Sequence, residues 1–272
     1  NSILASIDVA SGSVKVIVPA NSNPRPQYGK ISPSGRWLSY ATVSYPDDQI
    51  SWMRFDLAMA PVNKEGSIRT IQQDMEVPFY VAPNSFKWHP TEDKMVYVQD
   101  GKLFLLEIGH EGVTTLRQLY KGSGLAFYAY VLAFTSDGKH LIVGKDILME
   151  GETQLPQGLV VVAVDGSEPP REYNFGSTWE FKEMVLTNHN LVWEPEENHF
   201  MIAVKDRETG DSALVKLRLD TVVDGKVVWK AKAEVHQFQC RKNDPRVYCL
   251  YQDAQTPNDL YRFNENFTEK QR

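Results

Sequence analysis

Five stretches of the sequence repeat one pattern: an apolar strand with an aromatic or branched anchor, a polar tight turn, and a second apolar strand. They span residues 29–40, 86–98, 132–143, 191–204 and 236–251. Hairpins that recur at long and roughly even intervals are typical of repeat architectures. This repeat constrains the fold more than any single motif in the chain.

The spacing of the repeat points to one architecture. The anchor residues are Ile31, Trp88, Phe134, Trp193 and Phe238, which are 57, 46, 59 and 45 residues apart. Propeller blades of the WD40 and kelch types repeat at about 40–50 residues. We expect the longer intervals to hold insertions, at residues 45–49, at 150–157, and at a 222–228 hairpin with an Asp-Gly turn.

Further strands follow the five repeated hairpins, which we call the inner hairpins. The clearest are 102–108 with 115–119, then 159–166 with 171–173, then 213–219. Four strands per repeat build a propeller blade. No segment of ten or more residues has helical periodicity, and the best candidate, 67–76, lacks an apolar stripe. We therefore predict an all-β chain, a β-propeller of about five to six four-stranded blades, forming one domain or propeller fragment over residues 1–272.

Each end of the chain has only some of the four strands expected of a blade. Residues 3–9 and 14–18 are predicted to be the outer two strands of a blade, and 259–263 the third strand of the fifth blade. Either the N-terminal strands complete the last blade, or both ends are cuts through a longer propeller. The second alternative is favoured, because the N-terminus offers two strands where the last blade needs about one.

Composition excludes some partners. The net charge of −6, with acidic and basic residues interspersed, argues against a nucleic-acid surface, which needs a basic excess. No apolar run approaches the roughly 20 residues that span a bilayer. The sequence shows no leader segment that would fix the compartment, and a periplasmic or secreted location is favoured over a cytoplasmic one.

The two cysteines, Cys240 and Cys249, are not a Cys-x-x-Cys pair and have no histidine cluster close in sequence, so no metal or cofactor is expected. If the loop runs from Asn243 to Arg246, the two face each other across a hairpin. Opposed Cβ atoms lie about 4.5–5.5 Å apart, more than a relaxed disulfide allows. Free thiols are favoured, with a strained disulfide as the alternative.

The repeated phrase resembles the TolB-like or PD40 propeller repeat, an aromatic residue followed by Ser-Pro-Asp-Gly-Lys and an apolar strand. It appears here at residues 31–36 and 134–139, while Trp88 and Trp193 keep the aromatic residue and the proline but lose the glycine. Asp-Gly or Ser-Gly supplies the positive φ of the tight turn, and the aromatic ring packs between blades.

The segment 251–263, with its Pro-x-x-Leu-Tyr sequence, is similar to the last propeller blade of prolyl-oligopeptidase-family (S9) serine hydrolases, including the acylaminoacyl- and dipeptidyl-peptidase branches. A nucleophile elbow requires Gly-x-Ser-x-Gly, and this sequence has none. The resemblance therefore implies a non-catalytic propeller that gates the active site and contributes substrate binding. The α/β-hydrolase domain, with its Ser, Asp and His, would lie beyond Arg272.

Several tempting residues fall on turns of the repeat. Glu194, Glu196 and Glu197 replace the Ser-Pro-Asp-Gly turn, so we interpret them as turn residues and not as a glutamate pair for a substrate amino terminus. His89, His140 and His199 lie at or beside inner turns, where surface positions are favoured over a metal ring. A triad of Ser32, His89 and Asp137 is rejected, because the three lie on different blades.

Four residues remain as candidate binding positions: Tyr128, Tyr130, Trp52 and Arg54. The tyrosines follow a flexible Gly-Ser-Gly segment and would present aromatic rings at a channel mouth, with inter-blade packing as the alternative. The expected partner is a peptide substrate or another protein. The alternative function is a stand-alone TolB-like scaffold for protein–protein interaction; an enzyme acting in the channel would need converging carboxylates or histidines, which the sequence does not place.

Overall fold

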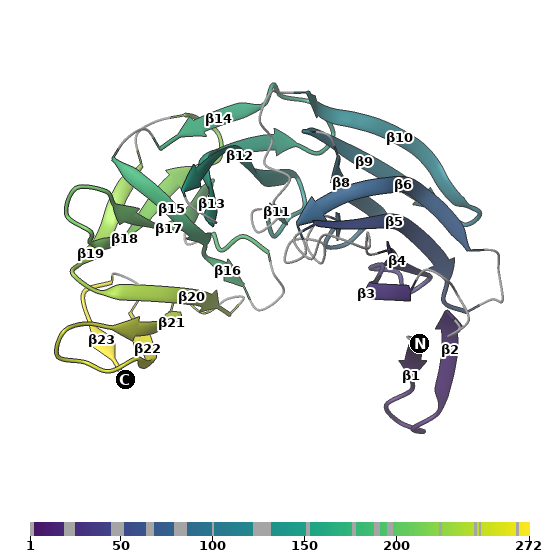
Figure 1. The fold of residues 1–272 in the computed structure, drawn as a ribbon, viewed down its shortest axis with the longest axis horizontal. Helices are drawn as coiled ribbons and strands as arrows, with labels where there is room; N and C mark the ends of the chain where they lie inside the picture. Colours follow the sequence, from purple (N-terminus) through teal and green to yellow (C-terminus); the bar gives the residue numbers. More distant parts are fainter. Residues whose placement is uncertain are drawn as a thin grey trace. The chain divides into compact units, whose positions relative to one another are not determined.

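The computed structural model of the chain describes residues 3–18, 25–44, 52–63, 68–78, 86–99, 101–121, 132–150, 153–175, 178–187, 191–194, 198–222, 225–241, 244, 246–264 and 267–272. Their regular structure is all β, arranged as propeller-like blades, as predicted (Figure 1). Within these ranges no helix is long and apolar enough to cross a membrane. The chain divides into two compact units, one ending at Lys121 and the other holding the described residues from Leu132 onward.

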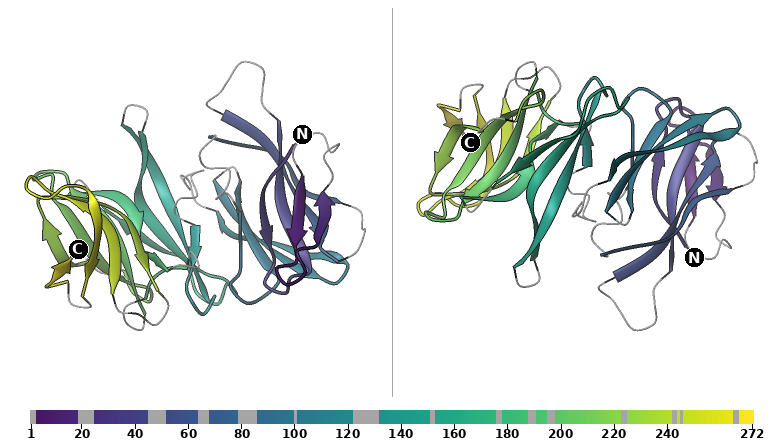
Figure 2. Two further views of the ribbon diagram at one scale, coloured as in Figure 1. Left: turned by 90° about the horizontal axis from the view of Figure 1, so that it is seen from below. Right: turned by 90° about the horizontal axis from the view of Figure 1, so that it is seen from above.

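The first unit contains a hairpin and two four-stranded antiparallel sheets (Figures 1 and 2). The hairpin is β1 (Leu4–Ile7) with β2 (Val14–Val18). The first sheet is β3 (Arg25–Ile31), β4 (Trp37–Ser44), β5 (Trp52–Pro61) and β6 (Arg69–Pro78). The second is β7 (Phe86–Trp88), β8 (Lys94–Gln99), β9 (Lys102–Gly109) and β10 (Gly112–Lys121).

The first sheet is buried on both faces because apolar residues occupy both sets of alternating positions. Successive side chains of a strand point to opposite faces. On β4, Leu38 and Tyr40 pack with Val18 of the hairpin, whereas Trp37 and Ala41 pack with the second sheet. The near-continuous apolar runs of the inner strands thus reflect packing between neighbouring sheets.

The second unit contains three sheets. One is β11 (Leu132–Phe134), β12 (His140–Glu150), β13 (Thr153–Ala163) and β14 (Arg171–Asn174). The next is β15 (Trp179–Met184), β17 (His199–Asp206), β18 (Ser212–Arg218) and β19 (Lys226–Ala231). The last is β16 (Leu186–Thr187), β20 (Glu234–Cys240), β21 (Val247–Gln252), β22 (Asp259–Phe263) and β23 (Lys270–Gln271).

The middle sheet of this unit separates two apolar cores. Phe200 and Ile202 of β17 face the β11–β14 sheet, and Met201 and Ala203 face the last sheet. Full burial of such side chains contributes roughly 1.5–3 kcal/mol each. Stacking of sheets through alternating apolar positions is therefore the main source of stability in both units.

Four of the five predicted inner hairpins are confirmed: β3–β4, β7–β8, β11–β12 and β20–β21. The fourth, at residues 191–204, is wrong, because β15 pairs with β17 in place of residues 191–193. The Val185 N–H donates to the Met201 carbonyl, and the Trp193 N–H donates to the Val185 carbonyl. An unanticipated strand therefore lies between the two predicted partners.

One of the three expected insertions needs correction. The described part of the insertion expected at residues 150–157 lengthens the β12–β13 hairpin, with Ile147 opposite Pro156. Residues 222–228 do not form a hairpin of their own, because β19 pairs with β18 and Val222 lies outside a strand. The 45–49 segment and Asp224 lie outside the described residues. The predicted non-helical character of 67–76 is confirmed for its described part, which belongs to β6.

The terminal strands each pair within their own unit. The last sheet has a strand after β22, because Phe263 pairs with Lys270 of β23. The N-terminal strands instead pair with each other and pack on the first sheet of their own unit. How the two ends complete a blade stays a prediction.

The cysteines do not oppose each other across the hairpin. Cys240 pairs with Val247, and Cys249 pairs with Tyr261 on the next strand. The reason is register: β21 begins at Val247, so the loop is longer than the four residues assumed; Asn243 itself lies outside the described residues. Both thiols are buried and free.

Candidate functional site

The four predicted binding residues are not brought together by the described part of the structure. Tyr128 and Tyr130 lie outside the described residues. Trp52 begins β5, opposite Pro78. Arg54 is exposed on the same strand, and its Nη1 lies 3.8 Å from a carboxylate oxygen of Asp74. Their roles in binding stay predictions.

The residue that follows each anchor is buried beneath the turn in three of the repeats. Ser32, His89 and Thr135 are 3%, 3% and 0% exposed. Nδ1 of His89 accepts the backbone N–H groups of Thr91 (3.2 Å) and Glu92 (3.0 Å). Thr135 Oγ1 likewise accepts the His140 N–H at 3.0 Å. The expectation that His89 is a surface histidine is therefore wrong, because its ring satisfies turn amides that would otherwise be buried without partners.

Glu194 also serves a turn, but that of the preceding sheet. Its Oε1 accepts the Ser136 backbone N–H at 2.7 Å. Glu196 and Glu197 lie outside the described residues. His140 and His199 begin β12 and β17 and are half-buried. No group of three or more metal-ligating side chains occurs within the described ranges.

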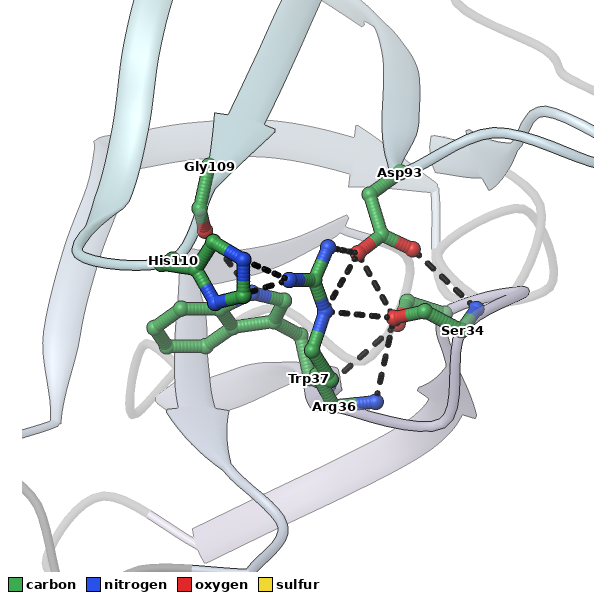
Figure 3. Close-up of polar contacts among 7 residues, drawn as sticks. Ser34, Arg36, Trp37, Asp93, Gly109 and His110 are labelled. Atoms are coloured by element: carbon green, nitrogen blue, oxygen red, sulfur yellow. Dashed lines mark hydrogen bonds and ion pairs between the residues drawn. The ribbon is translucent and has the colours of Figure 1, made fainter.

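A denser polar cluster joins the two four-stranded sheets of the first unit (Figure 3). Asp93 accepts the Ser34 hydroxyl at 2.6 Å and the Arg36 Nη2 at 2.7 Å. Arg36 Nη1 lies 3.0 Å from both ring nitrogens of His110, and Trp37 Nε1 donates to the Gly109 carbonyl at 3.2 Å.

The Asp93 carboxylate stays ionised in this cluster. Burial raises the pKa of Asp93, but hydrogen bonds from Ser34 and Arg36 outweigh burial, so its pKa lies below the usual value. Its side chain is only 6% exposed. Because donors from the neighbouring turn surround Asp93, this cluster acts as a lock between the two sheets.

Two lysines on adjacent sheet edges form the strongest candidate for ligand contact in the first unit. Lys30 lies on β3 and Lys87 on β7, each the edge strand of its sheet. Lys30 Nζ donates to the Phe86 carbonyl at 2.7 Å and lies 4.4 Å from the centre of the Phe86 ring. The Trp88 indole N–H donates to the Lys30 carbonyl at 3.2 Å, which fixes the two edges side by side.

Both amines are shifted towards neutrality. Burial, and secondarily the Lys87 ammonium, lowers the pKa of Lys30 to about 7. Burial lowers the pKa of Lys87 to about 8. Lysine whose pKa is lowered in this way serves either as a cation for anionic groups or as a neutral amine. A part of the Lys30 amine is therefore neutral near pH 7, and we call the pair the lysine edge.

The second unit places a carboxyl group, and not an amine, in a comparable position. Glu183 lies on β15, which packs against β20, and the nearby backbone amides of Gln237 and Phe238 lower its pKa less than burial raises it. Burial raises the pKa of Glu183 to about 7. Its Oε1 is buried and makes no hydrogen bond with any described residue. Gln237 has φ of +57° within a bulge of β20.

The sequence analysis missed the lysine edge and Glu183. Lys30 and Lys87 directly precede the anchors Ile31 and Trp88, so their shared place in the repeat was available as a signal. The burial of the two lysines could not be predicted from the sequence, because it depends on how the edges of the two sheets pack together. Glu183 lies on a strand that the repeat did not predict.

The sequence matches no protein-family model, and no curated protein matches it. Among solved structures, the fold is similar to a Mycobacterium tuberculosis puromycin-hydrolyzing peptidase, with a TM-score of 0.53 and 14% identity over 99% of this chain. It is also similar to the tricorn protease, with a TM-score of 0.56 and 11% identity over 99% of the chain. A chain from a mitotic checkpoint complex gives a TM-score of 0.54 and 13% identity over 99%.

These likenesses concern the fold, because the identities are low. The chain spans 41% of the puromycin-hydrolyzing peptidase and 28% of the tricorn protease. It spans 73% of the mitotic checkpoint chain. The class that the fold defines is thus an all-β, propeller-like chain.

Proposed function

We propose that this chain is the non-catalytic propeller of a prolyl-oligopeptidase-like serine peptidase, gating its active site and contributing substrate contacts. The observation that carries the proposal is the fold likeness to a puromycin-hydrolyzing peptidase, which takes in 99% of this chain but 41% of that one. A catalytic domain would occupy other parts of such a protein. The absence of Gly-x-Ser-x-Gly from these 272 residues supports a non-catalytic role.

The physical basis of gating is steric. Propeller blades surround a central channel, which admits extended peptides and excludes folded proteins. The lysine edge would supply contacts for carboxylates of such a peptide, because Lys30 and Lys87 lie on the edge strands of their sheets. The other proposed contacts are the candidates from the sequence: Tyr128, Tyr130, Trp52 and Arg54.

A serine-directed probe tests the non-catalytic part of this proposal. The 272-residue chain is treated with a fluorophosphonate, with a known serine peptidase as the positive control, and is assayed with acyl-peptide and dipeptide substrates. We expect neither labelling nor turnover. Labelling of the folded chain that disappears on denaturation would overturn the claim, because it would reveal an activated serine.

The native reading frame tests the peptidase part. If the frame encodes an α/β domain with Gly-x-Ser-x-Gly, the full protein should hydrolyse short peptides but not a folded protein that carries the same cleavable sequence. Equal cleavage of both would contradict gating.

The alternative is a stand-alone TolB-like scaffold that binds a protein partner. It is favoured by the larger coverage, 73%, of the chain from the mitotic checkpoint complex. A reading frame without a hydrolase domain, together with a stable complex with one partner at stoichiometric ratio, would select the scaffold over the peptidase propeller.

A further inference from the structure

A lysine ammonium group sits within an aromatic pocket of the last sheet. Lys270 Nζ lies 3.4 Å from the ring centre of Tyr251 and 4.9 Å from that of Tyr261. The two ring centres are 5.3 Å apart, and the rings are tilted by 58°. A carboxylate oxygen of Asp253 lies 3.7 Å from the same ammonium. Two ring faces and one carboxylate therefore surround a single cation.

The walls of this pocket are held independently of the lysine. Tyr251 and Tyr261 lie on the same face of β21 and β22, because Cys249 pairs with Tyr261 and Tyr251 pairs with Asp259. Both tyrosines belong to the apolar core of the last sheet and are 5% and 6% exposed. The Tyr251 hydroxyl donates to Asp253 at 2.7 Å, which fixes the carboxylate beside the ring. These walls would persist without Lys270.

The carboxylate wall is negatively charged at neutral pH. The hydrogen bond from the Tyr251 hydroxyl is the largest cause that keeps the pKa of Asp253 below its usual value, and the Lys270 ammonium contributes less. A cation above the face of a tyrosine ring is attracted by the ring quadrupole, and cages of this composition recognise alkylated ammonium groups. The chemistry of the pocket thus matches an alkylammonium ion.

The strand that carries the lysine is short and exposed. Lys270 belongs to the two-residue strand β23, which pairs with β22 through Phe263 and Arg262. Both residues of β23 are exposed, and the Lys270 side chain is 29% exposed, so the pocket opens to solvent along the path by which the lysine enters.

We propose that Tyr251, Tyr261 and Asp253 form a binding site for an alkylammonium group, which Lys270 occupies until the ammonium group of a ligand replaces it. The ligand class is a primary or methylated amine, such as a lysine side chain of a partner segment. Lys270 acts as a tethered competitor with an effective concentration on the order of millimolar. This site is independent of the proposed peptidase role, since it uses none of the lysine edge.

The test uses the whole 272-residue chain and two probes, n-butylammonium and tetramethylammonium, at constant ionic strength. The Lys270→Ala variant should bind at least one probe roughly tenfold more tightly than the wild type, because the tethered competitor is gone. Lys226→Ala removes an exposed lysine of β19 and should bind like the wild type. Combining Lys270→Ala with Asp253→Asn should weaken the binding again.

A second measurement needs no variant. In the wild type, Lys270 Nζ lies 3.4 Å from the centre of the Tyr251 ring, so the neighbouring ε-methylene protons should resonate upfield of those of other lysines. Saturating probe should move them to the ordinary lysine position. Tighter binding of n-butylammonium would identify an unmodified amine as the ligand, and tighter binding of tetramethylammonium a methylated one. The proposal is overturned if Lys270→Ala binds neither probe better than Lys226→Ala does, or if saturating probe leaves the Lys270 signals unmoved.

Discussion

In each unit, a carboxylate near an inner turn forms hydrogen bonds to the turn of a neighbouring sheet, but the partners of the carboxylate differ between the units. In the first unit, Asp93 accepts hydrogen bonds from both Ser34 and Arg36. In the second, Glu194 reaches across to the Ser136 N–H. Ionised hydrogen bonds are roughly twice as strong as neutral ones, and an arginine partner adds charge. The carboxylate that joins neighbouring sheets therefore contributes more to stability in the first unit than in the second.

Buried ionisable groups differ between the units as well. The first unit carries amines, Lys30 and Lys87, on regular sheet edges, and the second carries the carboxyl group of Glu183 against a bulge. Burial drives each pKa towards neutral pH, downwards for the amines and upwards for the acid. The two units thus share the same arrangement of strands, whereas the charge of the buried ionisable group differs with the local pairing of the strands.

The largest effect is expected from removing the carboxylate of the stronger lock. Asp93→Ala should lower the free energy of unfolding by about 2–3 kcal/mol, because Arg36 and the Ser34 amide lose their acceptor. Glu194→Ala should cost about 0.5–1.5 kcal/mol, the usual value of one hydrogen bond. Chemical denaturation of both variants measures the difference. Equal losses would show that the two locks do not differ in strength.

A smaller effect, with opposite pH dependence in the two units, is expected from the buried ionisable groups. The Lys30 pKa is lowered from 10.5 to about 7, so the unfolded state binds more protons between these values and stability rises with pH there. The Glu183 pKa is raised from 4.5 to about 7, so stability falls as pH rises through that window. The two contributions together give a minimum near pH 7.

Two neutral variants separate these contributions. Lys30→Met should stabilise the chain by about 2 kcal/mol at pH 6 and by progressively less towards pH 10. Glu183→Gln should stabilise it by a similar, roughly 2 kcal/mol, at pH 8 and little at pH 4. Unfolding free energies across pH 4–10 measure both. A gain that does not vary with pH would mean that the substitution acts through packing and not through charge.

The smallest effect is expected at Arg54. Its ion pair with Asp74 is exposed on both sides, at 53% and 73% of side-chain area. Arg54→Ala should change stability by less than about 0.5 kcal/mol. Any loss of peptide binding by this variant, measured by calorimetry against the wild type, therefore reports on ligand contact. A large loss of stability would instead assign Arg54 a structural role.

The sequence was sufficient for the all-β class and for four inner hairpins. Alternating apolar residues and regularly spaced turn residues are local patterns. Such patterns can be recognised without knowing which strands pack together. The misassigned fourth hairpin shows the limit. Residues 191–193 carry the repeat phrase, yet β15 takes their place beside β17.

Tertiary structure alone decided which polar groups are buried together. The sequence shows Lys30, Lys87, Glu183 and Lys270 as ordinary charged residues. Their environments arise from contacts between strands that are distant along the chain, such as β3 with β7 and β15 with β20. Desolvation and charge interactions depend on these distances and not on sequence spacing. For this reason the repeat determines the blades, whereas stacking of the blades determines the candidate sites.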